Sequence, residues 1–384
     1  LQGVAGAFLT TNSLALLRGA YGADAGRAIG LWTAFTSVAT ILGPPAGGAL
    51  VEWVSWRWIF LLNLPLAVAA VVRALLGREE APAPARTGRL DLPGAALAAT
   101  GLGLLTYGLV EGADRGFGEL WWTFVGAAAA LTAFAVVETR VAEPMLPFAL
   151  FRERNFAAAN AETFLVYAGL YGFFVFFTLY LQFLGFTPFE AGLLNIPASI
   201  VMIALAARFG ALSDKHGPRL FLTLGPALIG LGTLVFAIVD TRSGFWTFGI
   251  VGILLFSLGL AMMVAPITAT ALKSAPEHYA GIASGVNSTV SRLGSLIAVA
   301  VIGLAIGLVF DANTDAPDAV PLAVDQTAPD LRAASVDGFR AGMVIAAALA
   351  FAGAAVGAFG ISNREARGEP APPVTDSAPA PVES

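Results

Sequence analysis

The chain has 384 residues, of which 57% are hydrophobic and only 12% are charged. Ordinary globular domains are roughly 25% charged, so this composition excludes a typical soluble protein and favours a chain surrounded by lipid. There is no cysteine and there are two histidines, which excludes disulfides and thiolate metal sites, and no metal or cofactor is expected. The net charge of −5 comes without a basic patch, so nucleic acid is not an expected partner.

Long apolar blocks predict an all-α, polytopic bundle of membrane helices, because a bilayer core needs about 20 apolar residues per helix. Eleven spans are expected, at residues 1–17, 28–51, 57–76, 92–112, 121–139, 155–182, 190–212, 218–239, 245–271, 281–310 and 338–361.

The segments outside these spans differ in character. Residues 311–337 hold six aspartates and one arginine and are expected to form a long external loop. Residues 362–384 are rich in proline without periodicity, which predicts a disordered tail. The first residue is Leu1, and the sequence reads as apolar helix from there, so we expect an N-terminal truncation.

The distribution of basic residues predicts the orientation. One set of alternate loops holds 15 of the 21 Lys and Arg residues, and the opposite set holds five. Cytoplasmic loops are enriched in Lys and Arg, so the first set and the C-terminus are expected in the cytoplasm, in a multi-pass protein of a bacterial plasma membrane. Eleven spans then place Leu1 outside, which suggests that an odd number of helices precedes it.

The second predicted span carries a pattern of small residues and proline: Gly30, Ala39, Gly43, Pro44, Gly47 and Gly48. Glycines on one face let helices approach closely, and a proline bends a helix, so a simple packing face would explain the pattern. It also resembles the antiporter motif of proton-driven exporters in the major facilitator superfamily, with Ala39 in place of the middle glycine.

A second pattern lies between the spans 190–212 and 218–239, where a tight cytoplasmic turn is expected. It consists of Gly210, Asp214, Lys215, Gly217 and Arg219. A capped turn with a left-handed glycine would explain these residues without further function. Their spacing resembles the signature loop of the same superfamily, and the resemblance implies a charged lock that is remade as the transporter switches its open side.

Three further strings resemble the fourteen-helix drug:proton antiporters of the EmrB/QacA type. They are the start Leu1–Ala7, the string Trp56–Pro65, and Gly281–Gly285 followed by Asn287 and Arg292–Gly294. The resemblance implies a partial N-terminal bundle at 1–76, a linker with two extra helices at 77–153, a six-helix bundle at 154–361 and the tail at 362–384.

The span 155–182 is the densest candidate for substrate binding. Tyr167, Tyr171 and Phe174 share one helical face at i, i+4 and i+7, and Asn160 lies one step further back. Packing against lipid or neighbouring helices would explain the same aromatic residues. Asn195 on the next span and Asn287 on the span 281–310 are weaker polar candidates.

Glu162 is the sharpest candidate for proton coupling. It lies roughly 12 Å into the span at 1.5 Å per residue, where an unpaired carboxylate costs several kcal/mol. It either carries a proton or forms an ion pair with a cytoplasmic arginine. Arg292 also lies within a predicted span and has two interpretations. It either takes part in substrate binding or proton coupling, or it extends its long side chain to the membrane surface.

The resemblance implies a monomeric secondary exporter in a lipid bilayer. It would move drugs or other lipophilic small molecules by alternating access, in exchange for protons. Two alternatives stay open: export of one specific host metabolite or antibiotic, and a truncated product that transports nothing. No paired carboxylates, nucleophile–base set or cofactor loop remains after the spans are assigned, so an enzyme is not expected.

Overall fold

The structure is a computed structural model, and it describes residues 42–76, 91–141, 144–276, 279–316 and 319–363. The described residues form helices, short turns and loops without any strand, which confirms the predicted all-α bundle. Eight helical segments within these ranges are long and apolar enough to cross a membrane. The predicted spans 1–17 and most of 28–51 lie outside the described residues.

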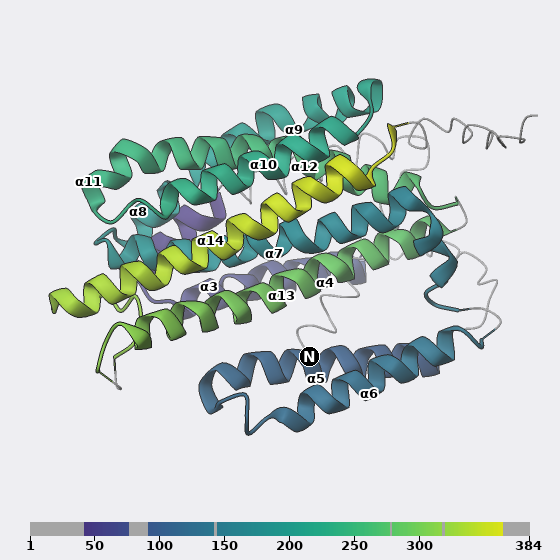
Figure 1. Cartoon of the computed structure of the whole chain (residues 1–384), viewed down its shortest axis with the longest axis horizontal. Helices are drawn as coiled ribbons and strands as arrows, with labels where there is room; N and C mark the ends of the chain where they lie inside the picture. The colour runs from purple at the N-terminus through teal and green to yellow at the C-terminus, as the bar shows by residue number, and fades with distance from the viewer. Residues whose placement is uncertain (1–41, 77–90, 142–143, 277–278, 317–318, 364–384) are drawn as a thin grey trace, which may run out of the picture.

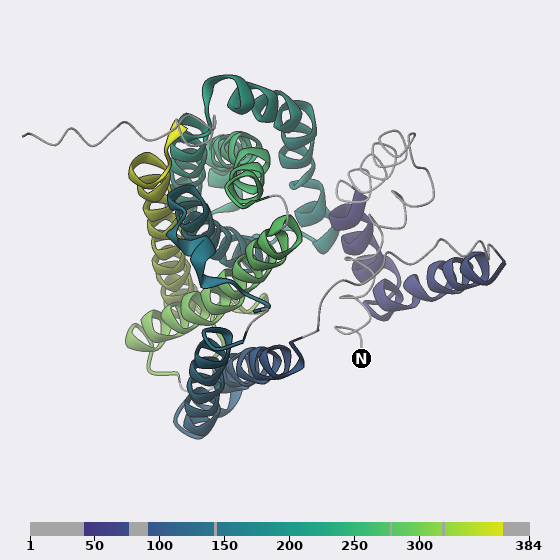
Figure 2. The same cartoon turned by 90° about the vertical axis from the view of Figure 1, so that its right-hand side faces the viewer.

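Six of the eight segments form one bundle (Figures 1 and 2). They are α7 (Arg154–Phe183), α9 (Ile196–His216) preceded by the short α8 (Pro188–Leu193), α10 (Arg219–Phe236), α12 (Ile250–Lys273) preceded by α11 (Arg242–Gly244) and the π-helical turn η3 (Phe245–Gly249), α13 (Ala280–Ala312) and α14 (Pro329–Gly360).

Within this bundle α7 is central, because it packs against α12, α13 and α14. The core around it is aromatic: the Phe173 ring lies 4.7 Å from that of Phe177 and 4.4 Å from that of Phe256. Small residues bring other helices together. A Cβ atom added at Gly225 of α10 would lie 2.9 Å from the Gly259 carbonyl oxygen of α12, so this close approach requires a residue without a side chain.

The other two segments, α5 (Leu92–Arg115) and α6 (Trp121–Glu138), pair with each other and lie beside α13 at the edge of the bundle (Figure 2). Asp91 caps α5 by accepting a hydrogen bond from the Gly94 N–H, and Pro93 occupies its first turn, as helix starts favour. The 3₁₀ turn η2 (Phe148–Arg152) leads from this pair into α7.

Before the gap at 77–90, the chain forms a helix over residues 42–53, then α3 (Arg57–Leu61) and α4 (Asn63–Leu76). The single predicted span at 57–76 is therefore wrong in one respect: the helix is interrupted at Leu62. Pro65 lacks an N–H and cannot donate to the Leu61 carbonyl four residues earlier, which explains the interruption.

Two predicted loops were also wrong. Residues 213–216, predicted to lie between helices, form the last turn of α9, and the chain reverses only at Gly217, with φ +94°, and Pro218. The loop between α13 and α14 is shorter than the predicted 311–337, because α13 continues to Ala312 and α14 already begins at Pro329. Pro329 at the helix start and Asp330 in the first turn favour this early beginning.

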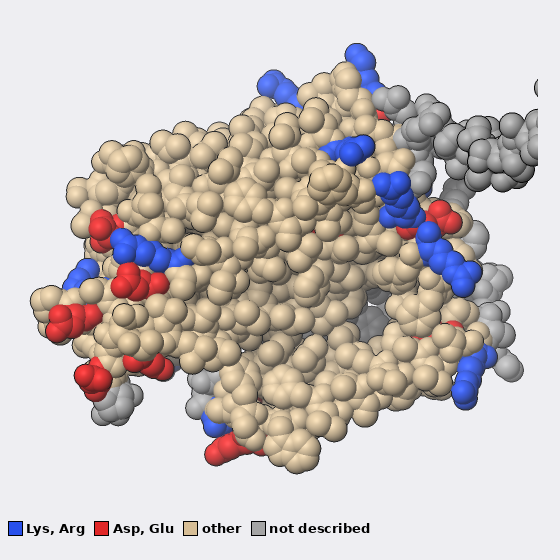
Figure 3. Space-filling view, viewed as in Figure 1, with Lys and Arg blue, Asp and Glu red and all other residues tan. Residues whose placement is uncertain are grey.

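Charges divide between the two ends of the bundle (Figure 3). Lys and Arg gather at the end where α6 finishes and α7 begins, on the right in the figure, and we call this the basic end. Asp and Glu concentrate at the opposite end, where α13 passes into α14, which we call the acidic end. The basic end carries the loops that the sequence predicts to be cytoplasmic.

Candidate functional site

The largely apolar pocket of the six-helix bundle has a volume of about 580 Å³. It lies among α7, α9 and α12, and Pro44 of the 42–53 helix closes one side of it. Besides Pro44, four residues that the sequence singled out line it: Tyr167, Tyr171 and Phe174 from α7, and Asn195 just before α9. The periodicity of α7 explains this arrangement, since positions i, i+4 and i+7 share one face.

The lining is aromatic and uncharged. The Tyr167 and Tyr171 rings stack with their centroids 6.3 Å apart, and Phe174 packs edge-on against Phe256 at 5.5 Å. Within the described residues neither tyrosine hydroxyl has a hydrogen-bond partner, so both can bond to a ligand. The amide nitrogen of Asn195 already donates to the Ala191 carbonyl at 2.9 Å.

The α9 wall of the pocket was missed from the sequence. Ser199, Met202 and Ile203 line the cavity, but nothing in their local pattern separates them from an ordinary apolar helix. Met is flexible and polarizable and suits surfaces that accept several ligand shapes. Together these groups make a cavity that can hold a flat or bulky apolar molecule with few hydrogen bonds.

Glu162 does not line this pocket. Its side chain is fully buried on another face of α7, with its Cγ 3.8 Å from the position where a Cβ of Gly353 on α14 would stand. Neither carboxyl oxygen has a hydrogen-bond partner, and no arginine of the described residues pairs with it. The predicted alternative of an ion pair with a cytoplasmic arginine is therefore wrong in this conformation.

Asn160 also points away from the pocket, contrary to its predicted place beside the aromatic residues. It lies toward the basic end, where its oxygen accepts a bond of 3.4 Å from the Asn287 amide of α13. The same amide donates to the Thr163 hydroxyl at 2.9 Å. All three side chains are buried, so they form a polar seam between α7 and α13.

Arg292, one turn further along α13 than this seam, has an exposed side chain and joins neither the pocket nor Glu162. Asn287 was a weak candidate in the sequence, and Thr163 was not recognised. A buried Asn in a span is a usable signal for such a seam, because its amide requires partners in apolar surroundings.

The residues of the predicted switch loop lie at the basic end. Asp214 accepts a 2.7 Å hydrogen bond from Lys273 of α12, an ion pair in which both side chains are exposed by more than half. Lys273 was not predicted as the partner. Lys215 is exposed, while Gly210 packs near Ala265 of α12, with 3.3 Å between their Cβ positions.

Residues 362 and 363 fit against this turn. A Cβ atom added at Gly217 would overlap the Asn363 side chain, and the Asn363 oxygen accepts a 3.0 Å bond from the Arg219 N–H. Ser362 exchanges two hydrogen bonds with Asn155, of 2.7 and 2.9 Å. The first two residues of the predicted disordered tail are thus ordered, and the others lie outside the described residues.

Part of the predicted antiporter motif packs against α8, while Gly30 and Ala39 lie outside the described residues. A Cβ atom added at Gly48 would overlap the Pro188 carbonyl, and one added at Gly192 would lie 2.5 Å from the Pro44 carbonyl oxygen. The Glu52 carboxylate accepts a 3.1 Å bond from the Phe189 N–H. By contrast, Gly43 and Gly47 face open space.

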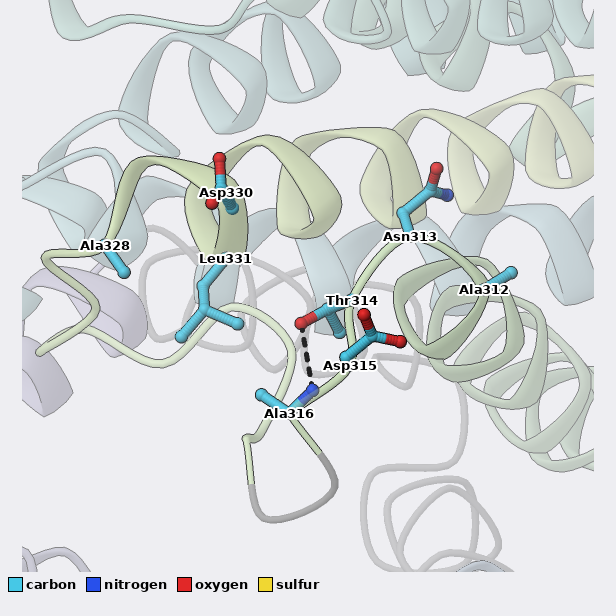
Figure 4. Close-up of a pocket in the computed structure, with 8 residues that line it drawn as sticks. All are labelled: Ala312, Asn313, Thr314, Asp315, Ala316, Ala328, Asp330 and Leu331. Carbon is cyan, nitrogen blue, oxygen red and sulfur yellow. Dashed lines mark hydrogen bonds between the residues drawn. The ribbon is translucent and has the colours of Figure 1, made fainter.

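A second cavity, of about 600 Å³, lies at the acidic end between α13 and α14 (Figure 4). Asp315 and Asp330 belong to its lining, and the Ala316 N–H donates to the Thr314 hydroxyl at 3.3 Å. Its residues come from the loop between α13 and α14 and from the adjoining helix ends, so it lies away from the α7 pocket.

Residues 1–299 match the family model described as Major Facilitator Superfamily. The chain is 34% identical over 311 residues to the multidrug resistance protein Stp of Mycobacterium tuberculosis, and 31% identical over 311 residues to the tetracenomycin C resistance and export protein of Streptomyces glaucescens. Each match covers 79% of this chain and 57% of the relative.

The puromycin resistance protein of Streptomyces alboniger is 32% identical over 361 residues, which cover 91% of this chain and 69% of that protein. The chain thus spans somewhat more than half the length of the first relatives it matches. Because the family model covers most of the sequence and eight described helical segments are suited to cross a bilayer, the chain is a multi-pass membrane protein that belongs to the major facilitator superfamily.

Proposed function

We propose that the chain belongs to a secondary active exporter that moves lipophilic small molecules across the membrane by alternating access. The observation that carries this proposal is the 580 Å³ aromatic pocket, which is lined by α7, α9 and α12 and by Pro44 from the helix that precedes them. A cavity between two helical groups is where transporters of this architecture bind their substrates.

The pocket chemistry supports a class of substrate. Aromatic rings, methionine and aliphatic side chains line it, and none of its lining residues is charged. We infer that it favours neutral aromatic molecules over cations, with hydrogen bonds from the Tyr167 and Tyr171 hydroxyls. The relatives' names concern tetracenomycin C and puromycin, which keeps export of a specific antibiotic as a second candidate function.

We propose Glu162 as the proton carrier. A carboxylate without partners in an apolar interior costs several kcal/mol, so the carboxyl group would be protonated in this conformation and would release its proton when water reaches it. Asn160 and the seam that it forms would hold α7 in place. Asp214 and Lys273 would act as the lock at the basic end, with Lys215 and Arg219 as further charges there.

For the architecture we propose the fourteen-helix drug:proton antiporter subtype. Support comes from the α5–α6 pair, which lies outside the bundle formed by α7 to α14, and from the motif strings. The proposed division remains 1–76, 77–153, 154–361 and 362–384, with the basic end and the C-terminus in the cytoplasm.

Dye efflux tests the proposal. Cells that express the protein, loaded with a neutral aromatic dye, should lose it faster than cells without the protein, and a proton uncoupler should abolish the difference. A cationic dye of similar size should be a poorer substrate. Equal dye accumulation with and without the protein would contradict the export function, whereas uncoupler-resistant efflux would contradict only the proton coupling.

A further inference from the structure

An apolar groove of about 500 Å³ lies between α13 and the α5–α6 pair. Fourteen residues line it, and Thr289 is the only one of them with a polar side chain. The Thr289 hydroxyl donates to the Gly285 carbonyl of its own helix at 2.9 Å, so it leaves no free donor. Figure 3 shows the surface hollowed between the helix pair and the bundle, toward the basic end.

The groove has the depth of one leaflet. Its lining on α13 runs from Gly281 to Leu293, which is roughly 18 Å at the helical rise of about 1.5 Å per residue. Half of a bilayer's hydrocarbon core is about 15 Å thick. On the other wall the lining reaches Leu131 of α6 and Phe151 of η2, so the groove begins at the basic end and extends toward the middle of the membrane.

Two arginines of the basic end lie close in sequence to residues that line the groove. Arg140 follows the end of α6, and Arg152 directly follows Phe151, a lining residue. Both side chains are exposed, and among the described residues neither forms an ion pair. Basic groups at this level of a membrane attract anionic lipid headgroups, by about 1 kcal/mol for each Lys or Arg.

The α13 wall has room for an occupant. Cβ atoms added at Gly281 or Gly285 would meet nothing within 4 Å. Gly294, on the side of the same helix that faces α7, differs, because a Cβ there would lie 2.5 Å from the Phe164 carbonyl oxygen. Helix packing therefore requires Gly294, whereas Gly281 and Gly285 widen the groove.

We propose that this groove binds one acyl chain of an anionic phospholipid, whose phosphate lies at Arg140 and Arg152. Three observations carry the proposal together: an apolar lining at membrane depth, a length that matches one leaflet, and unpaired arginines at the headgroup level. The lipid would fill the space that separates the α5–α6 pair from the bundle and hold the pair against α13.

Native mass spectrometry of the purified full chain tests the proposal, with phosphatidylglycerol and phosphatidylcholine of identical acyl chains as the probes. The unmodified chain should bind one phosphatidylglycerol more tightly than any further lipid, and more tightly than phosphatidylcholine. Gly285→Phe fills the groove and should abolish this tight binding. Gly307→Phe is the matched control, since Gly307 lies on the same helix, has open space around its Cβ position and is outside the groove.

The arginines give a second test that leaves the helix packing intact. Arg140→Gln and Arg152→Gln should each weaken phosphatidylglycerol binding by about fivefold and leave phosphatidylcholine binding unchanged. Arg115→Gln is the control, because Arg115 lies at the other end of α5, paired with Glu111 at 3.0 Å.

Three results would overturn the proposal. The first is equal binding of the two lipids, and the second is undiminished binding to Gly285→Phe. The third is displacement of phosphatidylglycerol by a transported dye, which would make the groove a substrate route. Should Gly285→Phe fail to fold, Gly281→Leu fills the same space with a smaller side chain, and the arginine variants decide independently.

Discussion

Two faces of α7 have contrasting surroundings. One face carries Tyr167, Tyr171 and Phe174 into an open aromatic cavity. The other carries Glu162 into a buried contact with α14, where neither carboxyl oxygen has a partner among the described residues. The proposed substrate pocket and the proposed proton carrier thus lie on one helix but in separate environments.

This separation has a mechanistic consequence. A proton and a substrate that bind at one place compete directly, whereas here they would communicate through movement of α7 as a body. Both groups lie on a helix of 30 residues without an internal proline, so a shift at one face is transmitted to the other. The seam of Asn160, Thr163 and Asn287 anchors the same helix to α13.

The largest effect is expected from Glu162→Gln. The amide keeps the size of the side chain but cannot release a proton, so proton-driven efflux should fall to the level seen with an uncoupler, and its dependence on the pH gradient should disappear. Substrate binding in the pocket should persist, which equilibrium dye binding can measure. Glu153→Gln, an exposed change at the N-cap of the same helix, is the control; a loss of dye binding in Glu162→Gln would show that the two faces are not separate.

The converse change is Tyr171→Ala, on the pocket face. Loss of the stacked ring should cost about 0.5–1.5 kcal/mol of binding free energy, which is about a two- to twelvefold rise in the dye Kd. The proton dependence of the remaining efflux should stay as it is. Leu179→Ala, an exposed position two turns along α7, is the control and should bind dye normally. A changed pH dependence in Tyr171→Ala would contradict the separation of the faces.

A smaller effect is expected at the seam. Asn287→Ala removes the amide that contacts both Asn160 and Thr163, and interhelical hydrogen bonds in membranes contribute about 0.6–2 kcal/mol. The melting temperature in detergent should fall by a few degrees, with dye affinity nearly unchanged. The control is Ser284→Ala on an exposed face of α13, which should leave the melting temperature unaltered. An unchanged melting temperature in Asn287→Ala would show that the seam does not anchor α7.

The smallest effect on stability concerns Asp214 and Lys273, which join the ends of two pocket walls, α9 and α12. Because both side chains are exposed by more than half, their coupling free energy should be only about 0–1 kcal/mol and should weaken with added salt. A double-mutant cycle with Asp214→Asn and Lys273→Gln measures it. A coupling well above this range would show that the pair is a stronger lock than its exposure permits.

The amino-acid sequence by itself determined most of the helices and two features of the site. Apolar blocks of bilayer length located α5, α6, α7 and α10 to within about three residues, because in a membrane every backbone group must be bonded within its own helix. The period of α7 placed Tyr167, Tyr171 and Phe174 together. The depth of Glu162 identified it as an unusual acid before any neighbour was known.

Only the tertiary structure decided which partner each helix face meets. Periodicity shows that Asn160 and Glu162 point in different directions, but not that one faces Asn287 and the other Gly353. It also could not reveal the pairing of Asp214 with Lys273 or the open space beside Gly285, since both arise where segments distant in sequence come together. The local sequence pattern determines a helix and its faces, whereas the neighbours of each face depend on how all the helices pack. The separation between Glu162 and the aromatic pocket is therefore a result of that packing.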